Sequence, residues 1–293
     1  MFTATLIAAG RLSPQTLSDA NERLAAAGCV PTTSGWIDEG DAADIAFGFA
    51  PDAARRSLES AFTGVDVVVQ PHAGRAKHLL VADMDSTMIT VECIDELADY
   101  AGIKPQIAAI TEAAMRGELD FAAALDARVA LLENLDADAI EQCRAERVRL
   151  MPGAKTLVRT MRAHGATAIL VSGGFTAFAD PVGAEIGFDR VIANRLDVVD
   201  GRLAGTVGKP IVDSATKERT LRAARTEFGL ADDATMAVGD GANDLAMIGV
   251  AGLGVAFHAK PIVAQAAAAR IDHNDLTALL WAQGIPRREW VQS

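Results

Sequence analysis

The amino-acid sequence predicts an α/β protein in which a Rossmann-like parallel sheet is covered by helices and preceded by a small α+β unit. From residue 78 onward, short apolar runs alternate with helical stretches, which is typical of parallel strands buried on both faces. The first 70 residues instead contain closely spaced short strands. The chain has 293 residues, 50% of them apolar and 23% charged, which favours about two globular domains with sizeable cores.

The N-terminal unit is predicted to have the element order β-α-β-β-α-β, which is ferredoxin-like. Ser13 and Pro14 are typical of a helix start, as N-cap and first helical residue, and Gly28 is a natural stop. The β-branched content of Val65–Gln70 indicates a strand. The remaining elements are expected to be strands at Thr3–Ala8, Gly35–Asp38 and Asp44–Ala50 and a helix at Ala53–Phe62. We assign this domain to residues 1–72.

A linker rich in Pro, Gly and charge leads into a second domain, which we assign to residues 73–293. The strands of its parallel sheet are expected at His78–Ala82, Thr167–Val171, Thr235–Val238 and Leu253–Phe257. The stretch from Glu92 to Leu150 has helical patterns and is too long for a simple crossover, which indicates an inserted helical segment at about residues 92–150. Further helices are expected near Pro152 and over the alanine-rich run Ala264–Ala269.

Charge and composition exclude several classes of protein. The formal charge of −12 argues against nucleic acids or membrane surfaces as partners, since both need clustered Lys and Arg. No run approaches the roughly 18 apolar residues of a membrane span, and no signal peptide is evident. Cys29, Cys93 and Cys143 form no C-x-x-C pair, which indicates a reducing compartment without structural zinc. We therefore expect a cytoplasmic protein.

Two carboxylates follow the first predicted strand of the parallel sheet. Asp83 and Asp85 are two residues apart, so on extended backbone they share a face at the carboxyl end of that strand. Open α/β sheets bind their ligands at this edge. Carboxylates this close repel each other unless a cation lies between them or one keeps its proton. Mg²⁺, which prefers oxygen ligands, meets that need; a strand that merely ends in a polar turn is the alternative.

A second acidic motif, Gly239-Asp240-Gly241-Ala242-Asn243-Asp244, follows the predicted strand Thr235–Val238. Its glycines allow a tight turn and a close approach of the backbone to a ligand. A turn alone would not need two aspartates beside an apolar run. We therefore expect Asp240 and Asp244 to join the first motif at the same edge of the sheet.

Two further groups suit the oxygens of a phosphate. Ser172-Gly173-Gly174, at the end of another predicted strand, offers a hydroxyl and free backbone N–H groups. Lys217 is expected in the first turn of a helix capped by Asp213 or Ser214, where a cation opposes the helix dipole unless an anion binds nearby. Taken alone, the first motif could be an ordinary turn, and Lys217 could be an ordinary surface lysine.

Oxygen ligands, a lysine and a hydroxyl at neighbouring strand ends together predict phosphoryl transfer, with a carboxylate able to act as the nucleophile. A Walker-type nucleotide hydrolase is disfavoured, because Gly208-Lys209 is followed by Pro210 and Leu203 stands where the first glycine is needed.

In this order, the four motifs resemble those of the haloacid dehalogenase superfamily and, within it, the phosphoserine phosphatase family. The resemblance covers about residues 78–280, and Asp83-Met84-Asp85-Ser86-Thr87 matches D-x-D-x-T. It implies that Asp83 is the nucleophile and that Asp85 is the general acid and then the general base. It also implies that Mg²⁺ is held by the carboxylates of Asp83 and Asp240 and by the backbone carbonyl of Asp85. Asp244 would not bind the ion directly but would support the groups that do. Ser172 and Lys217 would bind the phosphoryl oxygens, assisted by Asn243.

The segment Thr111–Phe121 resembles the helical cap of the phosphoserine phosphatases. The resemblance implies that Glu92 binds the ammonium group of the substrate and Arg128 its carboxylate. Met115 and Phe121 would close over the substrate, and Gly173 would offer backbone contacts. Phe121, Leu125 and Arg128 are spaced four and three residues apart, so one helix face can carry all three. A core phenylalanine and a solvated arginine remain the alternative.

The resemblance implies hydrolysis of O-phospho-L-serine to L-serine and phosphate through an aspartyl-phosphate, which is the last step of serine biosynthesis. The N-terminal unit is similar to the ACT-like domains that precede some of these enzymes and that often bind amino acids or pair subunits, so a homodimer is possible. Three alternatives stay open: a phosphatase for another small phosphomonoester, a phosphotransferase with an acceptor alcohol, and an amino-acid-sensing regulatory protein.

Overall fold

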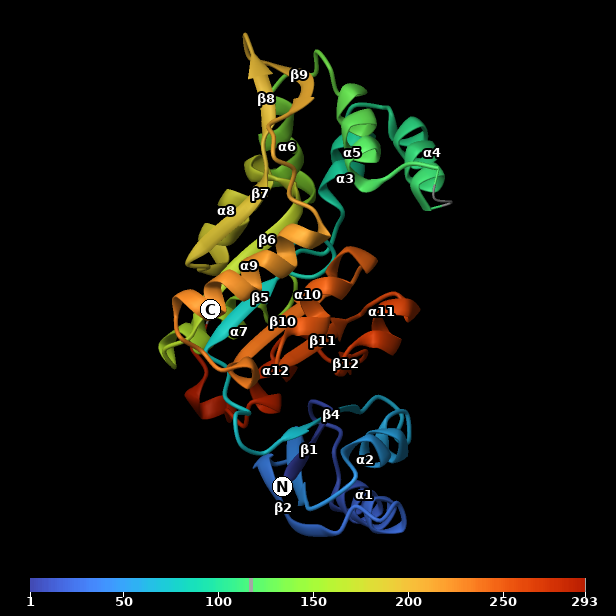
Figure 1. Cartoon of the computed structure of the whole chain (residues 1–293), viewed down its shortest axis with the longest axis vertical. Helices are drawn as coiled ribbons and strands as arrows, with labels where there is room; N and C mark the ends of the chain where they lie inside the picture. The colour runs from blue at the N-terminus through green and yellow to red at the C-terminus, as the bar shows by residue number, and fades with distance from the viewer. Residues whose placement is uncertain (116–117, 293) are drawn as a thin grey trace.

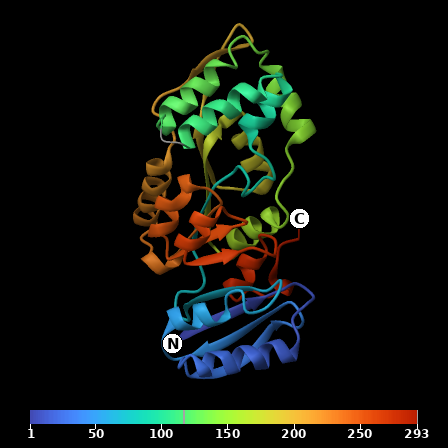
Figure 2. The ribbon, with the colours of Figure 1, turned by 90° about the vertical axis from the view of Figure 1, so that its right-hand side faces the viewer.

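The computed structural model describes residues 1–115 and 118–292, and it arranges them in three parts along one long axis (Figures 1 and 2). A group of helices lies at one end, a sheet covered by helices lies in the middle, and a small sheet with two helices lies at the other end. Within these residue ranges, no helix has both the length and the apolar character that crossing a membrane would require.

The N-terminal part is an antiparallel sheet with the strand order β2-β3-β1-β4. Its elements are β1 (Phe2–Ile7), α1 (Pro14–Ala26), β2 (Pro31–Asp38), β3 (Ala42–Phe47), α2 (Pro51–Leu58) and β4 (Asp66–Pro71). The predicted ferredoxin-like order is thus confirmed. Ser13 caps α1 by accepting a hydrogen bond from the Thr16 N–H, as its position before Pro14 predicts.

The middle part is a parallel sheet with the strand order β12-β11-β10-β5-β6-β7. Its strands are β5 (Leu79–Ala82), β6 (Thr167–Phe175), β7 (Arg190–Asn194), β10 (Thr235–Gly239), β11 (Leu253–Phe257) and β12 (Ala269–Ile271). Its helices are α7 (Ala154–Ala163), α8 (Thr176–Ile186), α9 (Ser214–Glu227), α10 (Leu245–Val250), α11 (Pro261–Ala266) and α12 (Ala278–Ala282).

The four predicted strands of this sheet are confirmed, whereas β7 and β12 were not expected. The helix predicted over Ala264–Ala269 is wrong at its end, because α11 stops at Ala266 and β12 begins at Ala269. Residues of β12 pair with β11 at the edge of the sheet. This tertiary pairing outweighs the high intrinsic helix propensity of alanine.

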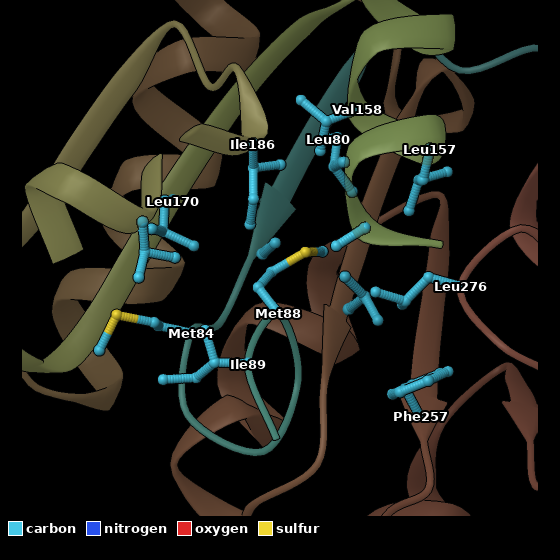
Figure 3. Close-up of a cluster of buried hydrophobic side chains, with 14 of the residues drawn as sticks. Leu80, Met84, Met88, Ile89, Leu157, Val158, Leu170, Ile186, Phe257 and Leu276 are labelled. Carbon is cyan, nitrogen blue, oxygen red and sulfur yellow. The ribbon is translucent and has the colours of Figure 1, made fainter. Parts of the chain in front are cut away.

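Side chains of β5 alternate between the two faces of the sheet. Leu80 packs with Leu157 and Val158 of α7 in one buried cluster, which Figure 3 shows. Leu79 lies in another buried cluster with Leu221 of α9. Because both faces are covered, every residue of β5 is buried, which is the reason that the strand is a continuous apolar run.

The inserted helices lie between β5 and β6 and consist of α3 (Cys93–Tyr100), α4 (Lys104–Met115), α5 (Phe121–Ala130) and α6 (Asp138–Arg147). A β-bridge between Ile89 and Leu150 closes the base of this insertion. An unpredicted hairpin, β8 (Leu196–Val199) and β9 (Arg202–Val207), follows β7 and contacts α5. The helical insertion itself agrees with the sequence prediction, and Figure 1 shows it at the end of the molecule opposite β1–β4.

The N-terminal sheet is fixed to the middle part through β4. The buried carboxylate of Asp66 accepts hydrogen bonds from the backbone N–H groups of Asp272, at 2.8 Å, and Asn274, at 3.0 Å. The side chain of Asn274 donates to the carbonyl of Ile7 and accepts from the N–H of Ala9. These directional contacts set the orientation of the small sheet against the loop that follows β12.

Candidate active site

Three strands of the parallel sheet end side by side and bring the predicted motifs together. A cavity of about 420 Å³ lies at this edge, between the sheet and the inserted helices. Among the residues that line it are Asp83, Asp85, Glu92, Phe121, Arg128, Gly173, Asp240 and Asn243. Residues as far apart in the sequence as Asp83 and Lys260 therefore face one space.

A cluster of buried carboxylates lies at the ends of β5 and β10. Oxygen atoms of Asp83, Asp240 and Asp244 all lie within 4.8 Å of one another. Burial, followed by the negative charges of Asp83 and Glu92, raises the pKa of Asp240 to about 6. Oxygen donors that repel each other in this way fit a hard divalent cation, which would relieve the repulsion. A Cβ at Gly239 would lie 2.3 Å from the Asp244 carboxylate, so only glycine leaves room for this arrangement.

Lys217 compensates part of this negative charge. The side chain of Asp213 caps α9 and accepts from the Thr216 N–H at 2.7 Å, which places Lys217 in the first turn. Its ammonium lies 2.6 Å from Oδ1 of Asp83 and 2.7 Å from Oδ1 of Asp244. Burial alone would lower the pKa of Lys217, but the two carboxylates outweigh it and raise that pKa. The cation that opposes the helix dipole thus has buried anionic partners.

The side chain of Asp85 lies outside the carboxylate cluster and has partners of its own. Its Oδ1 accepts from the backbone N–H of Cys93 at 2.8 Å, and its Oδ2 accepts from the Ser172 hydroxyl at 3.3 Å. Burial, followed by the charges of Glu92 and Asp83, raises the pKa of Asp85. A carboxyl group with a raised pKa is suited to give up and take back a proton near neutral pH.

Glu92 and Arg128 reach the cavity from the inserted segment. Glu92 immediately precedes α3 and accepts a hydrogen bond from the Ser86 hydroxyl at 2.7 Å. Arg128 lies on α5, and its Nε donates to the carbonyl of Ala124 at 3.2 Å. Within the described parts of the chain, no carboxylate forms an ion pair with Arg128. The remaining N–H groups of its guanidinium are therefore open to a ligand in the cavity.

Phe121 extends from the start of α5 toward the end of β6. A Cβ added to Gly173 would lie 3.2 Å from Cζ of Phe121, so the ring sits directly against the backbone of that glycine. Asn243 lies on a short 3₁₀ turn, Ala242–Asp244, and also lines the cavity. The side chain of Met115 and the neighbouring residues Arg116 and Gly117 lie outside the part of the chain that the structure describes.

Sequence reasoning missed two residues near the carboxylates. Lys260 lines the cavity, and its charge acts to lower the pKa of Asp240. The buried Thr87 hydroxyl lies 3.5 Å from Oδ1 of Asp240. A signal for Lys260 was available, because it follows β11 closely and side chains just after a parallel strand reach the ligand-binding edge.

The chain is similar in sequence to curated phosphoserine phosphatases. The phosphoserine phosphatase of Streptomyces coelicolor is 49% identical over 236 residues, which are 80% of this chain and 57% of that protein. The phosphoserine phosphatase SerB2 of Mycobacterium tuberculosis is 48% identical over 77% of this chain and 55% of that protein. The chain thus spans little more than half the length of these two curated relatives.

A solved structure and a family model also match this chain. A crystal structure of a haloacid dehalogenase family hydrolase from Salmonella enterica serovar Typhi superposes with a TM-score of 0.83 at 27% identity. That match covers 96% of this chain and 98% of the other. The model of the haloacid dehalogenase-like hydrolase family matches residues 80–249, which contain the carboxylates, Ser172 and Lys217. The chain therefore belongs to the haloacid dehalogenase-like hydrolases.

Proposed function

We propose that the protein is a phosphoserine phosphatase that hydrolyses O-phospho-L-serine to L-serine and phosphate. One observation carries this proposal: a single cavity is lined both by Asp83, Asp85 and Asp240 and by Glu92 and Arg128. The first three suit phosphoryl transfer, and the last two offer opposite charges to the two ends of an amino acid. A phosphorylated sugar has neither an ammonium nor a carboxylate group to meet them.

Substrate recognition relies on the inserted helices. The guanidinium of Arg128 binds the substrate carboxylate, for which a planar pair of N–H donors is well matched. The carboxylate of Glu92, held by Ser86, binds the substrate ammonium. Phe121 covers the substrate, and the backbone of Gly173 supplies polar contacts.

Hydrolysis proceeds in two steps, both at Asp83. In the first, a carboxylate oxygen of Asp83 attacks phosphorus, the bond from phosphorus to the serine oxygen breaks, and Asp85 gives its proton to that oxygen. In the second, water attacks the phosphorus of the aspartyl-phosphate while Asp85 takes a proton from that water. Phosphate leaves, and both carboxyl groups return to their starting states. The raised pKa of Asp85 supports this double role.

The carboxylate cluster supports Mg²⁺ as the cofactor. Asp83 and Asp240 would hold the ion together with the backbone carbonyl of Asp85, and Asp244 would support it. When bound, Mg²⁺ supplies positive charge to the phosphoryl oxygens. Lys217, Ser172 and Asn243 bind the same oxygens from the protein side. Lys217 is also held by Asp244, which keeps its ammonium pointed at Asp83.

We extend the proposal to the organisation of the chain. Residues 1–72 form an ACT-like domain, and residues 73–293 form the phosphatase domain with a cap at about 92–150. The contacts of Asp66 and Asn274 join the two domains. A homodimer and a cytoplasmic location remain predictions of the sequence, as does the absence of a nucleic-acid partner.

The test is phosphate release with Mg²⁺ from a panel of esters: both enantiomers of phosphoserine, phosphothreonine, phosphohomoserine and sugar phosphates. We expect a strong preference for O-phospho-L-serine and a loss of at least about a thousandfold in Asp83→Asn. Asp19→Asn, on the distant α1, is the matched control and should keep wild-type activity. Circular dichroism verifies that both variants are folded.

Other results would redirect the assignment. Turnover of a different ester but not phosphoserine would keep Asp83 as the nucleophile and replace the substrate. No turnover of any ester would favour a regulatory protein. Incorporation of labelled serine into phosphoserine, faster than net phosphate release, would favour a phosphotransferase.

A further inference from the structure

The strand β6 leaves regular pairing just where it reaches the cavity. Val171 pairs with Ile192 of β7, but the next pair is Phe175 with Asn194. Ser172, Gly173 and Gly174 therefore bulge out opposite a single residue of β7. Bulges of this kind redirect side chains next to active sites, and they leave backbone groups without a partner in the sheet.

The side chain of Asn194 supplies that partner. Asn194 is the last residue of β7 and is only 2% exposed. Its Nδ2 donates to the Gly173 carbonyl at 2.8 Å, and its Oδ1 accepts from the Val212 N–H at 2.8 Å. The amide thus ties the bulge to the segment that leads into α9 and Lys217.

From Asn194, hydrogen bonds run in one direction to Asp85. The Gly173 carbonyl belongs to the same peptide group as the Gly174 N–H, which donates to the Ser172 hydroxyl at 2.8 Å. That hydroxyl in turn donates to Oδ2 of Asp85 at 3.3 Å. Each group in this series accepts on one side and donates on the other, so the bonds reinforce one another.

The bulge also lies tightly against the acid. A Cβ at Gly174 would lie 2.9 Å from Oδ2 of Asp85 and 3.0 Å from the Ser172 oxygen. A side chain at position 174 would thus displace Ser172 or Asp85, so the backbone of the bulge packs directly against both. The Ser172 hydroxyl is thus hydrogen-bonded both to this peptide group and to the Asp85 carboxyl.

We infer that Asn194 is a positioning residue, which aligns the general acid Asp85 through the Gly173–Gly174 peptide and Ser172. The inference rests on the role of Asp85 in the proposed function. Asn194 touches neither the cavity nor the carboxylate cluster, so it acts only through its neighbours. Its contribution should matter most when the leaving group needs a proton.

The experiment compares esters that differ in this need. The serine alkoxide must be protonated as it leaves, whereas p-nitrophenolate and acetate leave as stable anions from p-nitrophenyl phosphate and acetyl phosphate. The first variant is Asn194→Leu, which removes the three hydrogen bonds of the amide, to the Gly173 carbonyl and to the carbonyl and N–H of Val212. The second is Asn194→Asp, which keeps an acceptor for the Val212 N–H. Asn274→Leu is the matched control, because it removes another buried, hydrogen-bonded asparagine at the distant domain contact.

We expect both Asn194 variants at pH 7.5 to lose about tenfold more kcat/KM on phosphoserine than on the two activated substrates. The ratio kcat/KM reports the transfer to Asp83, whereas kcat also includes the hydrolysis of the aspartyl-phosphate, which all substrates share. Asn274→Leu should leave the ratio of these rates unchanged, even if its melting temperature falls. Equal losses on all substrates, or no loss, would overturn the inference and leave Asn194 with a purely structural role. A wild-type ratio in Asn194→Asp would also overturn it, because the bond to Val212 would then be the important one.

Failure of the proposed function gives a different result. If the wild-type protein hydrolyses another alkyl phosphate instead of phosphoserine, the substrate assignment fails. The same comparison between that alkyl ester and the activated substrates still decides the role of Asn194.

Discussion

The ammonium of Lys217 lies 2.6 Å from Oδ1 of Asp83, and the two side chains are 0% and 6% exposed. The nucleophile of the proposed reaction therefore shares its charge with a buried cation before any substrate arrives. Asp244 holds the same ammonium from its other side, at 2.7 Å. This triad of charges links the stability of the folded protein to the integrity of its candidate active site.

Removal of Lys217 should destabilise the fold through the carboxylates that it leaves unpaired. We expect Lys217→Met to lower the free energy of unfolding by about 3 kcal/mol. In the background of Asp244→Asn, which removes one of those carboxylates, the same substitution should cost clearly less. Urea unfolding of the wild type, the two single variants and the double variant measures this coupling. Equal losses in both backgrounds would show that Asp244 and Lys217 act independently.

Divalent ions should be required for turnover and should stabilise the fold. We expect EDTA to abolish phosphate release and Mg²⁺ to restore it and to raise the melting temperature. Asp240→Asn should increase the Mg²⁺ concentration for half-maximal activity by at least about tenfold, because it removes a charged oxygen donor. The control Asp19→Asn should respond to Mg²⁺ as the wild type does. An unchanged Mg²⁺ dependence in Asp240→Asn would place the ion elsewhere.

Arg128 should discriminate substrates by their carboxylate. We expect Arg128→Ala to raise KM for phosphoserine by about 50-fold, since charge-assisted hydrogen bonds to the substrate are lost. Phosphoethanolamine, which lacks the carboxylate, should be affected less than about threefold. Arg128→Lys should give an intermediate KM, because an ammonium cannot replace the planar pair of donors. Steady-state kinetics on both esters decide the matter, and equal losses would remove Arg128 from this role.

The stability of the protein should depend on pH through Lys77, in the segment between the two sheets. Lys77 is 6% exposed, and its ammonium donates to the carbonyls of Gly74 and Asp233. Burial lowers the pKa of Lys77 to about 8, against an ordinary value of 10.5. Between these two pH values the unfolded chain binds more protons at this site than the folded chain. The contribution of Lys77 to stability should therefore increase as the pH rises from 8 to 10.5.

Urea unfolding of the wild type and of Lys77→Met at several pH values tests this dependence. The difference in unfolding free energy between the two proteins cancels other titrating groups. We expect it to shift in favour of the wild type from pH 8 to pH 10.5 and to be flat from pH 6.5 to 7.5. A difference that stays constant over the whole range would contradict the lowered pKa.

Much of the fold could be predicted because its signals are local. Ser13 before Pro14 sets the start of α1, and the apolar runs after residue 78 match β5, β6, β10 and β11. The carboxylates were found because each follows such a run, and parallel strands bring their carboxyl ends to one edge. Their positions directly after predicted strands were therefore sufficient to predict that Asp83 and Asp240 would face the same space.

Other features depend on contacts that no short stretch of sequence reveals. The buried bonds of Asn194 join β7 to residues at the ends of β6 and just before α9, and a single asparagine carries no periodic signal. The strand β12 is short and lies in an alanine-rich stretch, so only its pairing with β11 defines it. Asp213 and Ser214 were equally good caps for α9, and only the hydrogen bond to Thr216 decides between them.

The anchoring of β4 has a consequence for anyone who wishes to shorten this protein. Ile7 and Val68 on the open face of the small sheet belong to the same buried cluster as Leu279 of α12. The indole N–H of Trp281 donates to Asp38, and the Asn274 side chain donates to Asp66. A truncated protein that begins after the linker would expose the apolar residues of this contact to solvent. It would also leave several polar groups without their hydrogen-bond partners. The linker between the two domains is thus a poor place to truncate the chain. The N-terminal domain covers apolar surface of the hydrolase domain that would otherwise face solvent.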